Sequence, residues 1–287
     1  MTSYADDTWL IFGGNPLTGD DLFLINYAWQ TESIGSRETV PSIRGSNISV
    51  PYLPGEVWRP KIAGPKTLSL GIHITDVSYV DGVQYTTEAG RRGSFNRNLR
   101  IIKGAFFTPG ALLNFGRQVL LEPEGTAIPQ IMSAELVGSM QPSMIGPYAC
   151  RLVVDLLMSD PYWYSYEPIT ASFAIGAGDT LNNPGDDLAR KFQIEIEAVG
   201  GDLVNPLITN ATNDLALTYV GTIADGDILQ INTADMTAVI GTTSVVMNLA
   251  WSGSPSWFLL NRLDNTVDAS ADSGDGTVSF SYVVPYV

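Results

Sequence analysis

The sequence predicts an all-β protein, mainly antiparallel, with one amphipathic helix. Three observations predict this fold class: apolar residues alternate or run in stretches of strand length, turn residues separate these stretches, and only one segment shows helical periodicity. Hydrophobic residues make up 45% of the 287 residues, and this length suits about two domains with substantial cores. We therefore expect two β domains in one chain.

The first half contains the longer predicted strands. They are "DTWLIF", "DLFLINYAW", "KTLSLGIHITDVSYV", "RQVLLEP", "PQIMSAELVGS" and "YACRLVVDLLMS". Residues 40–66 are rich in Pro and Gly, and each Pro lacks the backbone N–H that a sheet ladder needs. This stretch is predicted to be a long ordered loop.

The single helix is predicted in "GSFNRNLRIIKGAFFTPG". Phe95, Leu99, Ile102 and Phe106 recur there at helical spacing, which is typical of an amphipathic helix with one buried face. Ser94 is the predicted N-cap, because a hydroxyl can accept a hydrogen bond from a free N–H of the first turn.

Arg97, Arg100 and Lys103 fall off this apolar stripe. With three further residues they form a basic run that no acidic residue interrupts: Arg91, Arg92 and Arg117. One interpretation is an oligomer interface facing an acidic neighbour, or a surface for nucleic acid. The other is a solvated helix face, since cations are also favourable near a helix C-terminus.

The second half predicts an antiparallel β-sandwich, so the expected domains are residues 1–167 and 168–287. In "KFQIEIEAV", the apolar Phe192, Ile194 and Ile196 alternate with polar residues, as in a half-buried strand. Shorter strands are predicted in "LALTYVG", "DILQIN", "TAVIG", "SWFLL" and "TVSFSYVV".

Charge is distributed unevenly between the two halves. Residues 1–167 carry 12 basic and 16 acidic groups, whereas residues 168–287 carry 3 basic and 14 acidic groups, which together give the net charge of −15. An acidic surface repels phosphate backbones and anionic lipid. Specific binding of nucleic acid or of a membrane is therefore not expected.

An aromatic segment, "DPYWYSYEP", lies near the expected domain boundary. Its residues Pro161, Tyr162, Trp163 and Tyr164 favour a stiff domain junction, because prolines restrict the backbone and rings on alternate sides can pack in two directions. A stacking platform for a sugar or cofactor is the alternative interpretation.

No motif in the sequence predicts catalysis, a cofactor or a metal site. The single histidine, His73, lies on the polar side of a predicted strand, and the single cysteine, Cys150, alternates with apolar residues as a buried thiol would. Neither a nucleophile elbow nor a glycine-rich phosphate loop is present. No apolar run approaches the length of a membrane span, and the N-terminus lacks the order of a secretion signal.

The order of these features resembles the distal tail protein (Dit) family of long-tailed, non-contractile phages (siphophages), also called minor tail proteins. The resemblance lies in "WLIFGGNPLTGDDLFLINY", "RGSNISVPYLPGEVWRPKIAGPKTLSLGIHI", the aromatic "DPYWY" and "NPGDDLARKFQIEIEAVGGDLVNPLITNATNDLALTYVGTIADGDILQIN". The sequence departs from the family pattern at "INTADMTAV", where the family has an Ile-Asp step followed by a basic residue.

The resemblance implies a structural virion protein and not an enzyme. It implies an N-terminal split-barrel-like domain that assembles into a hexameric ring, and a C-terminal galectin-like β-sandwich. The implied partners are other copies of the chain, the tail tube protein, the tail-tip hub or tail-associated protein, and the tape measure protein. The implied location is the tail tip or baseplate of the virion, after assembly in the host cytoplasm.

A second functional class stays open from the residues themselves. The aromatic-rich "WSGSPSWF" contains Trp251 and Trp257, either of which could stack on a sugar in a carbohydrate-binding module that recognises host-surface glycan. An exposed aromatic row would favour this function, and rings buried between sheets would favour the structural one.

Overall fold

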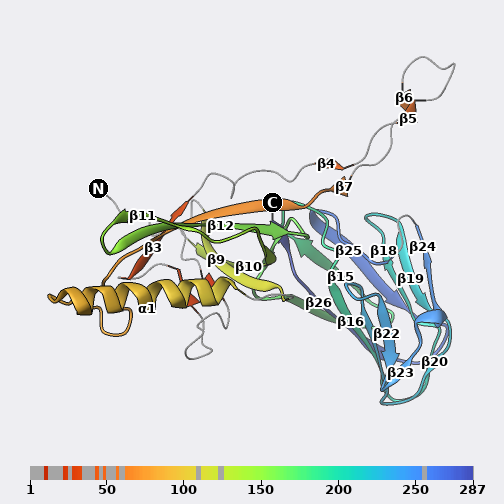
Figure 1. Ribbon diagram of the computed structural model, residues 1–287. Helices are drawn as coiled ribbons and strands as arrows, with labels where there is room; N and C mark the ends of the chain where they lie inside the picture. The colour runs from red at the N-terminus through yellow and green to blue at the C-terminus, as the bar shows by residue number, and fades with distance from the viewer. Residues whose placement is uncertain are drawn as a thin grey trace. The chain divides into compact units, whose positions relative to one another are not determined.

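The structure of the protein is a computed structural model, and it describes most of the chain. The described residues are 10–11, 22–24, 28–33, 43–44, 48–49, 56–57, 62–107, 111–121, 126–253 and 257–286. They form two compact units, the first ending at Trp163 and the second comprising Tyr164–Tyr286. The mainly antiparallel all-β class is confirmed, and the described residues contain one α-helix (Figure 1).

The first unit is built on a curled antiparallel sheet with the strand order β2-β1-β9-β10-β12-β8-β3, and β11 pairs with β12. Its strands are β1 (Leu10–Ile11), β2 (Leu22–Phe23), β3 (Trp29–Ser33), β8 (Lys66–Ile74), β9 (Leu113–Leu121), β10 (Thr126–Val137), β11 (Pro142–Gly146) and β12 (Ala149–Met158). The strand predicted in residues 21–29 is confirmed only in part: Leu22–Phe23 and Trp29 are strand, whereas Leu24 and Ala28 are bends and residues 21 and 25–27 lie outside the described residues.

The pairing of β8 with β12 organises this sheet. Cys150 lies opposite Ile74 and Met158 lies opposite Lys66, with every residue between them in continuous register. Alternate side chains along both strands are buried, and this face of the pair includes Leu70 and Val154. The period of two predicted from the sequence therefore places one apolar face toward the core.

The Pro-rich stretch of residues 40–66 is not simply a loop. It contains four short strands: β4 (Ile43–Arg44), β5 (Ile48–Ser49), β6 (Glu56–Val57) and β7 (Ile62–Ala63). β4 pairs with β7, and β5 pairs with β6, both antiparallel. The pairing is compatible with the prolines because none of them falls within these strands, so each paired residue keeps its N–H.

Helix α1 (Glu88–Phe106) begins earlier than predicted. Its N-cap is Thr87, whose hydroxyl accepts a hydrogen bond from the Gly90 N–H at 3.2 Å, whereas the predicted cap Ser94 is buried inside the helix. The first turn was not predicted from the sequence, because it contains Gly90 and glycine has a low helix propensity. A Cβ at this position would lie 2.7 Å from the Tyr85 Cβ, so close packing requires the glycine.

One face of α1 is buried in the first unit. Phe95, Ile102 and Phe106 are buried as predicted, while Leu99 is only half-buried because the buried face is centred on other residues. The remaining buried residues are Ser94, Asn98, Ile101 and Ala105. Asn98 Nδ2 donates to the carbonyl oxygens of Thr75 (2.9 Å) and Val77 (2.7 Å), which ties the helix to the chain leaving β8.

The second unit is a β-sandwich of two antiparallel sheets. The first sheet, in spatial order, contains β14 (Ile169–Ala174), β26 (Gly276–Tyr282), β16 (Phe192–Ala198), β21 (Ile228–Asn232), β22 (Thr237–Ile240) and β23 (Thr243–Ser244). The second contains β15 (Gly178–Asn183), β25 (Leu263–Ser270), β18 (Leu207–Asn210), β19 (Leu215–Tyr219) and β24 (Leu249–Ser252). Smaller elements are β17 (Leu203–Val204), β20 (Thr222–Ile223), the 3-10 turn η1 (Val246–Asn248) and β27 (Pro285–Tyr286). Strand β13 (Trp163–Ser165) begins at the last residue of the first unit.

The sandwich core is apolar and takes side chains from both sheets. Phe192, Ile194 and Ile196 of β16 are buried, as the alternation predicted, together with Leu217 and Val267 of the facing sheet. The predicted strand in "SWFLL" is wrong: its described residues, 257–260, form no strand beyond a single bridge at Leu260.

Three fully buried asparagines, Asn183, Asn210 and Asn265, hold this non-strand segment in place. Asn210 Nδ2 donates to the Leu259 carbonyl at 3.0 Å. Asn265 Nδ2 donates to the carbonyls of Asn261 and Leu263, both at 2.9 Å, and its Oδ1 accepts from the Asn261 N–H at 2.8 Å. Side-chain amides thus replace the ladder bonds that a strand would have supplied.

We predict that a fragment of residues 164–287 folds alone, because the second unit has its own two-sheet core. The fragment should give dispersed amide resonances and a cooperative thermal transition. An aggregated or disordered fragment would show that the two halves share one core.

We also predict that Asn265→Ala lowers the free energy of unfolding by about 1–3 kcal/mol, because it leaves buried backbone groups without partners. Urea unfolding followed by tryptophan fluorescence measures the change. The control is Asn182→Ala, which removes an exposed hydrogen bond to Asp264 and should change stability by at most about 0.5 kcal/mol. Equal effects of the two variants would contradict a structural role for the buried amides.

Candidate functional site

The exposed side of α1 carries the three predicted interface cations. Arg97 and Arg100 are exposed, and Lys103 is half-buried near the end of the helix. Among the residues that the structure describes, none of the three forms an ion pair with a carboxylate. The structure therefore leaves a positive stripe on α1 that has no partner within the described chain.

The basic run predicted from the sequence does not form one surface. Arg91 turns inward: its guanidinium pairs with Asp76 and lies 4.8 Å from the centre of the Tyr148 ring. Arg92 pairs with Glu88 one turn earlier at 3.8 Å, an exposed contact of low energetic value. The side chain of Arg117 lies outside the described part of the structure.

Asp76 is a buried carboxylate whose pKa the fold perturbs in this region. Burial raises its pKa, but hydrogen bonds from Arg91 and Gln84 outweigh burial and hold the pKa below the ordinary value of 3.8. The side chain of Asp76 is only 7% exposed, so the carboxylate depends on these donors in place of water. The pair fixes the first turn of α1 to the chain that follows β8.

Trp251 and Trp257, the candidate glycan platform, are brought together by the fold. Their rings stack with centroids 5.5 Å apart and an interplanar angle of 27°. Trp251 lies on the edge strand β24 and is 44% exposed, whereas Trp257 is half-buried against the sandwich core. The arrangement is neither an exposed aromatic row nor a pair of core rings, because the exposed ring of Trp251 stacks on the half-buried ring of Trp257.

The backbone beneath this pair is strained. Trp257 has φ of +69°, a conformation that costs free energy for a bulky residue. Hydrogen bonds from Asn210 (3.0 Å) and Asn213 (3.1 Å) to the Leu259 carbonyl hold the adjacent backbone. The ring of Trp257 is therefore presented by a segment that the buried amides fix.

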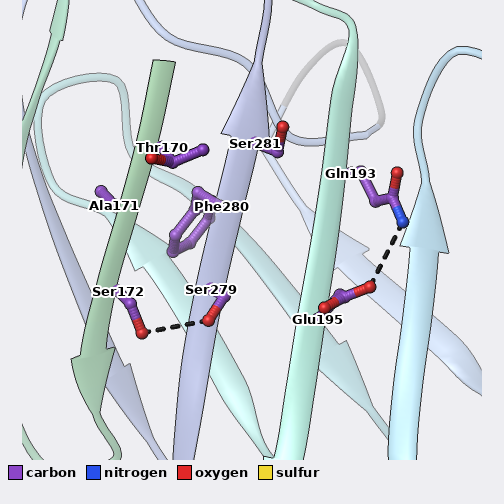
Figure 2. Close-up of a pocket in the computed structure, with 8 residues that line it drawn as sticks. All are labelled: Thr170, Ala171, Ser172, Gln193, Glu195, Ser279, Phe280 and Ser281. Carbon is purple, nitrogen blue, oxygen red and sulfur yellow. Dashed lines mark hydrogen bonds between the residues drawn. The ribbon is translucent and has the colours of Figure 1, made fainter. Parts of the chain in front are cut away.

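A shallow polar depression of about 490 Å³ lies on the outer face of the other sheet (Figure 2). Its lining residues are Thr170, Ala171, Ser172, Gln193, Glu195, Ser279, Phe280 and Ser281. Ser172 and Ser279 hydrogen bond across β14 and β26 at 3.0 Å. Glu195 accepts from Gln193 at 3.3 Å and from Gln230 at 3.0 Å. These groups could hydrogen bond a polyhydroxylated ligand, but the one lining ring, Phe280, points into the core.

The tryptophan pair and the polar depression do not form one site. Trp251 belongs to β24 in one sheet, whereas the depression is formed by β14, β26 and β16 in the other. The residues of the depression were not singled out in the sequence. The signal for them was the polar phase of the alternation in these strands, which a solvated strand face produces equally well.

The junction residues lie where the two units divide, between Trp163 and Tyr164. Pro161 and Trp163 are buried, while Tyr162 and Tyr164 are half-buried. The Nζ of Lys191 lies 3.7 Å from the centre of the Tyr164 ring, a cation–π contact inside the second unit.

The single histidine and single cysteine occupy strand positions in the first unit. His73 lies on the half-buried polar face of β8, opposite Gln30 and Arg151. Cys150 is fully buried, and burial raises the pKa of its thiol. The described residues contain no group of three or more His, Cys, Asp and Glu side chains able to hold a metal ion. Neither described helix is long and apolar enough to cross a membrane.

A comparison with solved structures finds a structural likeness over nearly the whole chain. The Dit protein of phage SPP1, described as a paradigm of the hub adsorption apparatus in phages that infect Gram-positive bacteria, matches with a TM-score of 0.62. The match covers 96% of this chain and 98% of the SPP1 protein, at 11% identity. This chain has the Dit fold. Because the match spans both units, the Dit fold accounts for the sheet with its helix as well as the sandwich.

Weaker likenesses involve the baseplate of phage p2 in its activated conformation. The structure with strontium has a TM-score of 0.45 at 8% identity, and the structure with calcium has 0.44 at 8% identity. They cover 96% and 97% of this chain, and 97% and 98% of the respective p2 chains. No protein-family model matches the sequence, and a search of curated proteins gives no match.

We predict that Arg91→Ala lowers the free energy of unfolding by about 1.5–3 kcal/mol near neutral pH, because it strands the buried Asp76 carboxylate. The wild-type contribution is present above the ordinary Asp pKa of 3.8 and is lost as pH falls through the lower folded value. The difference between wild type and variant should therefore shrink as the pH is lowered below 3.8.

Urea unfolding across this pH range tests the prediction, with Arg92→Ala as the matched control. Arg92 forms only an exposed pair within the helix, so its loss should cost about 0.3–0.5 kcal/mol. A difference between Arg91→Ala and wild type that stays constant with pH would contradict the assigned role of Asp76.

Proposed function

We propose that this chain is a structural protein of a phage tail tip. In this proposal its copies form a hexameric ring that joins the tail tube to the tail-tip hub or baseplate. The observation that carries the proposal is the Dit fold, which spans both units and matches the hub adsorption protein of SPP1 over nearly the whole length of both chains. Other copies, the tail tube protein, the hub or tail-associated protein and the tape measure protein are the proposed partners.

The surface of the first unit supports a role in assembly. Arg97, Arg100 and Lys103 follow the outer side of α1, and large apolar side chains are exposed beside both ends of the helix. Exposed apolar groups next to cations that have no ion pair among the described residues are typical of a surface that a partner covers. The location that follows is the tail of the virion, after assembly in the host cytoplasm.

The proposed function requires no chemistry. A thiol with a raised pKa is a poor nucleophile, and Cys150 has no access to a substrate because it is fully buried. His73 lies on a strand face near the C-terminal end of β8. We therefore propose that the chain is not an enzyme.

Glycan recognition by the second unit is the second candidate function. Trp251, 44% exposed and stacked on Trp257, favours it, because an exposed and supported indole can stack on a sugar ring. This role is compatible with ring formation, since it uses a different unit of the chain.

Native mass spectrometry of the purified chain tests the ring. We predict a hexamer for wild type, and loss of the ring for Arg97→Glu combined with Arg100→Glu without unfolding of the monomer. Each exposed ion pair is worth at most about 1 kcal/mol, but a closed ring repeats it at every interface. The effect should be largest at low ionic strength, because salt screens these charges.

The control for charge reversal is Arg190→Glu, an exposed residue of the second unit, which should leave the ring intact. Wild-type-like rings from the double variant across a salt series would show that the basic stripe is a solvated face. A monomeric wild type at all concentrations would contradict ring formation by the chain itself.

Binding of cell-wall glycans to the full chain tests the second candidate. We predict that Trp251→Ala abolishes any glycan-dependent change in tryptophan fluorescence, whereas Met247→Ala, an exposed neighbour on η1, keeps it. Absence of binding by wild type, or equal binding by both variants, would exclude the tryptophan pair as a sugar platform.

A further inference from the structure

The loop between β8 and α1 forms an ordered projection, which we call the tip, with three exposed apolar side chains. Val80, Val83 and Tyr85 are 61%, 49% and 42% exposed. The loop closes on itself through backbone bonds from the Ser78 N–H to the Val83 carbonyl (3.0 Å) and from the Gly82 N–H to the Ser78 carbonyl (2.8 Å). The backbone that carries the exposed side chains is therefore held in one conformation by its own hydrogen bonds.

Side-chain contacts brace the tip further. Asp81 accepts hydrogen bonds from the Val83 N–H and the Tyr85 hydroxyl, both at 3.2 Å. At the base of the loop, the ion pair between Asp76 and Arg91 fixes it to α1. A pre-ordered surface loses little conformational entropy when it binds, so the tip is suited to docking.

An apolar groove of about 470 Å³ lies at the other end of α1. Its lining residues are Lys103, Gly104, Phe107, Leu136, Gly138, Ser139 and Met140. Phe107 is 65% exposed, and the neighbouring Val137 is 44% exposed. Large apolar side chains are thus exposed to water beside a concave surface, as in a pocket that receives an apolar group from a partner.

Opposite charges accompany the tip and the groove. Asp81 lies among the apolar residues of the tip, beside the pair that Glu88 forms with Arg92. Lys103 lines the groove, and Arg100 lies one turn before it on α1. Because the tip precedes the N-terminus of α1 and residues at its C-terminus line the groove, the two surfaces lie at opposite ends of one helix. A surface complementary to the groove is therefore present on every copy of the chain.

We infer that the tip of one copy docks in the groove of the next copy, with Val83 and Tyr85 against Phe107 and Leu136. This inference rests on the proposed ring and names the contact that closes it. Two different surfaces that meet head to tail generate a ring when the rotation closes.

The length of α1 sets the scale of such a ring. Its 19 residues span about 28 Å, so neighbouring copies would repeat at no less than that distance. In a sixfold ring the spacing between neighbours equals the radius. The contact is therefore compatible with an axial channel through the ring.

Cysteine cross-linking of the full chain tests the contact. Two differently tagged variants, Val83→Cys and Phe107→Cys, are mixed and oxidised, and Tyr85→Cys with Phe107→Cys is a second pair. All three positions are exposed, and the native Cys150 is buried. We expect mixed dimers at several-fold higher yield than dimers of either variant alone, and several-fold less of them at high salt. Met247→Cys, 91% exposed in the second unit, is the control and should give no mixed dimers with either variant.

The outcomes distinguish failure of this contact from failure of the proposed ring. Native hexamers without mixed cross-links would overturn the contact and leave the proposed function standing. Mixed cross-links that grow into open chains would support the contact and contradict the ring. Same-site dimers alone would indicate a symmetric interface, and absence of any cross-link would point to a tail protein of another kind in the groove; both results overturn the inference.

Discussion

The register between β8 and β12 is the constraint on which the first unit depends. Because Ile74 lies opposite Cys150 and the pairing continues without a shift to Lys66 and Met158, apolar side chains of both strands share one face. A slip by one residue would turn these side chains to solvent and the polar ones to the core. The chain that leaves β8 leads to α1, and the ion pair between Asp76 and Arg91 fixes the first turn of the helix to it. The same register therefore also determines how α1 is oriented, and with it the positions of Arg97 and Arg100.

In the second unit, an irregular segment of chain covers part of the sandwich core. Backbone groups there have no ladder partner, and the buried Asn183, Asn210 and Asn265 satisfy them. These amides also stabilise a backbone with positive φ at Trp257 and Leu263. Polar groups in the interior thus permit a strained surface segment, which a purely apolar core could not hold.

Sequence periodicity predicted the elements whose side chains alternate between core and solvent, such as β12 and β16, because burial alone determines that pattern. It failed where tertiary contacts override local preference. The start of α1 was not predicted because glycine at position 90 disfavours helix. Residues 257–260 were predicted as a strand from their apolar composition, although buried asparagines hold them as a loop. The stripe of Arg97 and Arg100 was visible in the sequence, whereas the inward turn of Arg91 depended on a carboxylate fifteen residues away. The apolar tip and groove could not be predicted, because exposure of Val83 or Phe107 follows only from the packing around them.

These features connect fold to assembly: the sheet register orients α1, α1 presents cations and an apolar end, and the Dit fold spans both units. The most direct measurement is cryo-electron microscopy of assembled tails that contain this chain. We predict one closed ring of six copies at the tip end of the tube, with α1 at the contact between neighbours. Copies distributed along the tube, or a threefold arrangement, would contradict the proposed role.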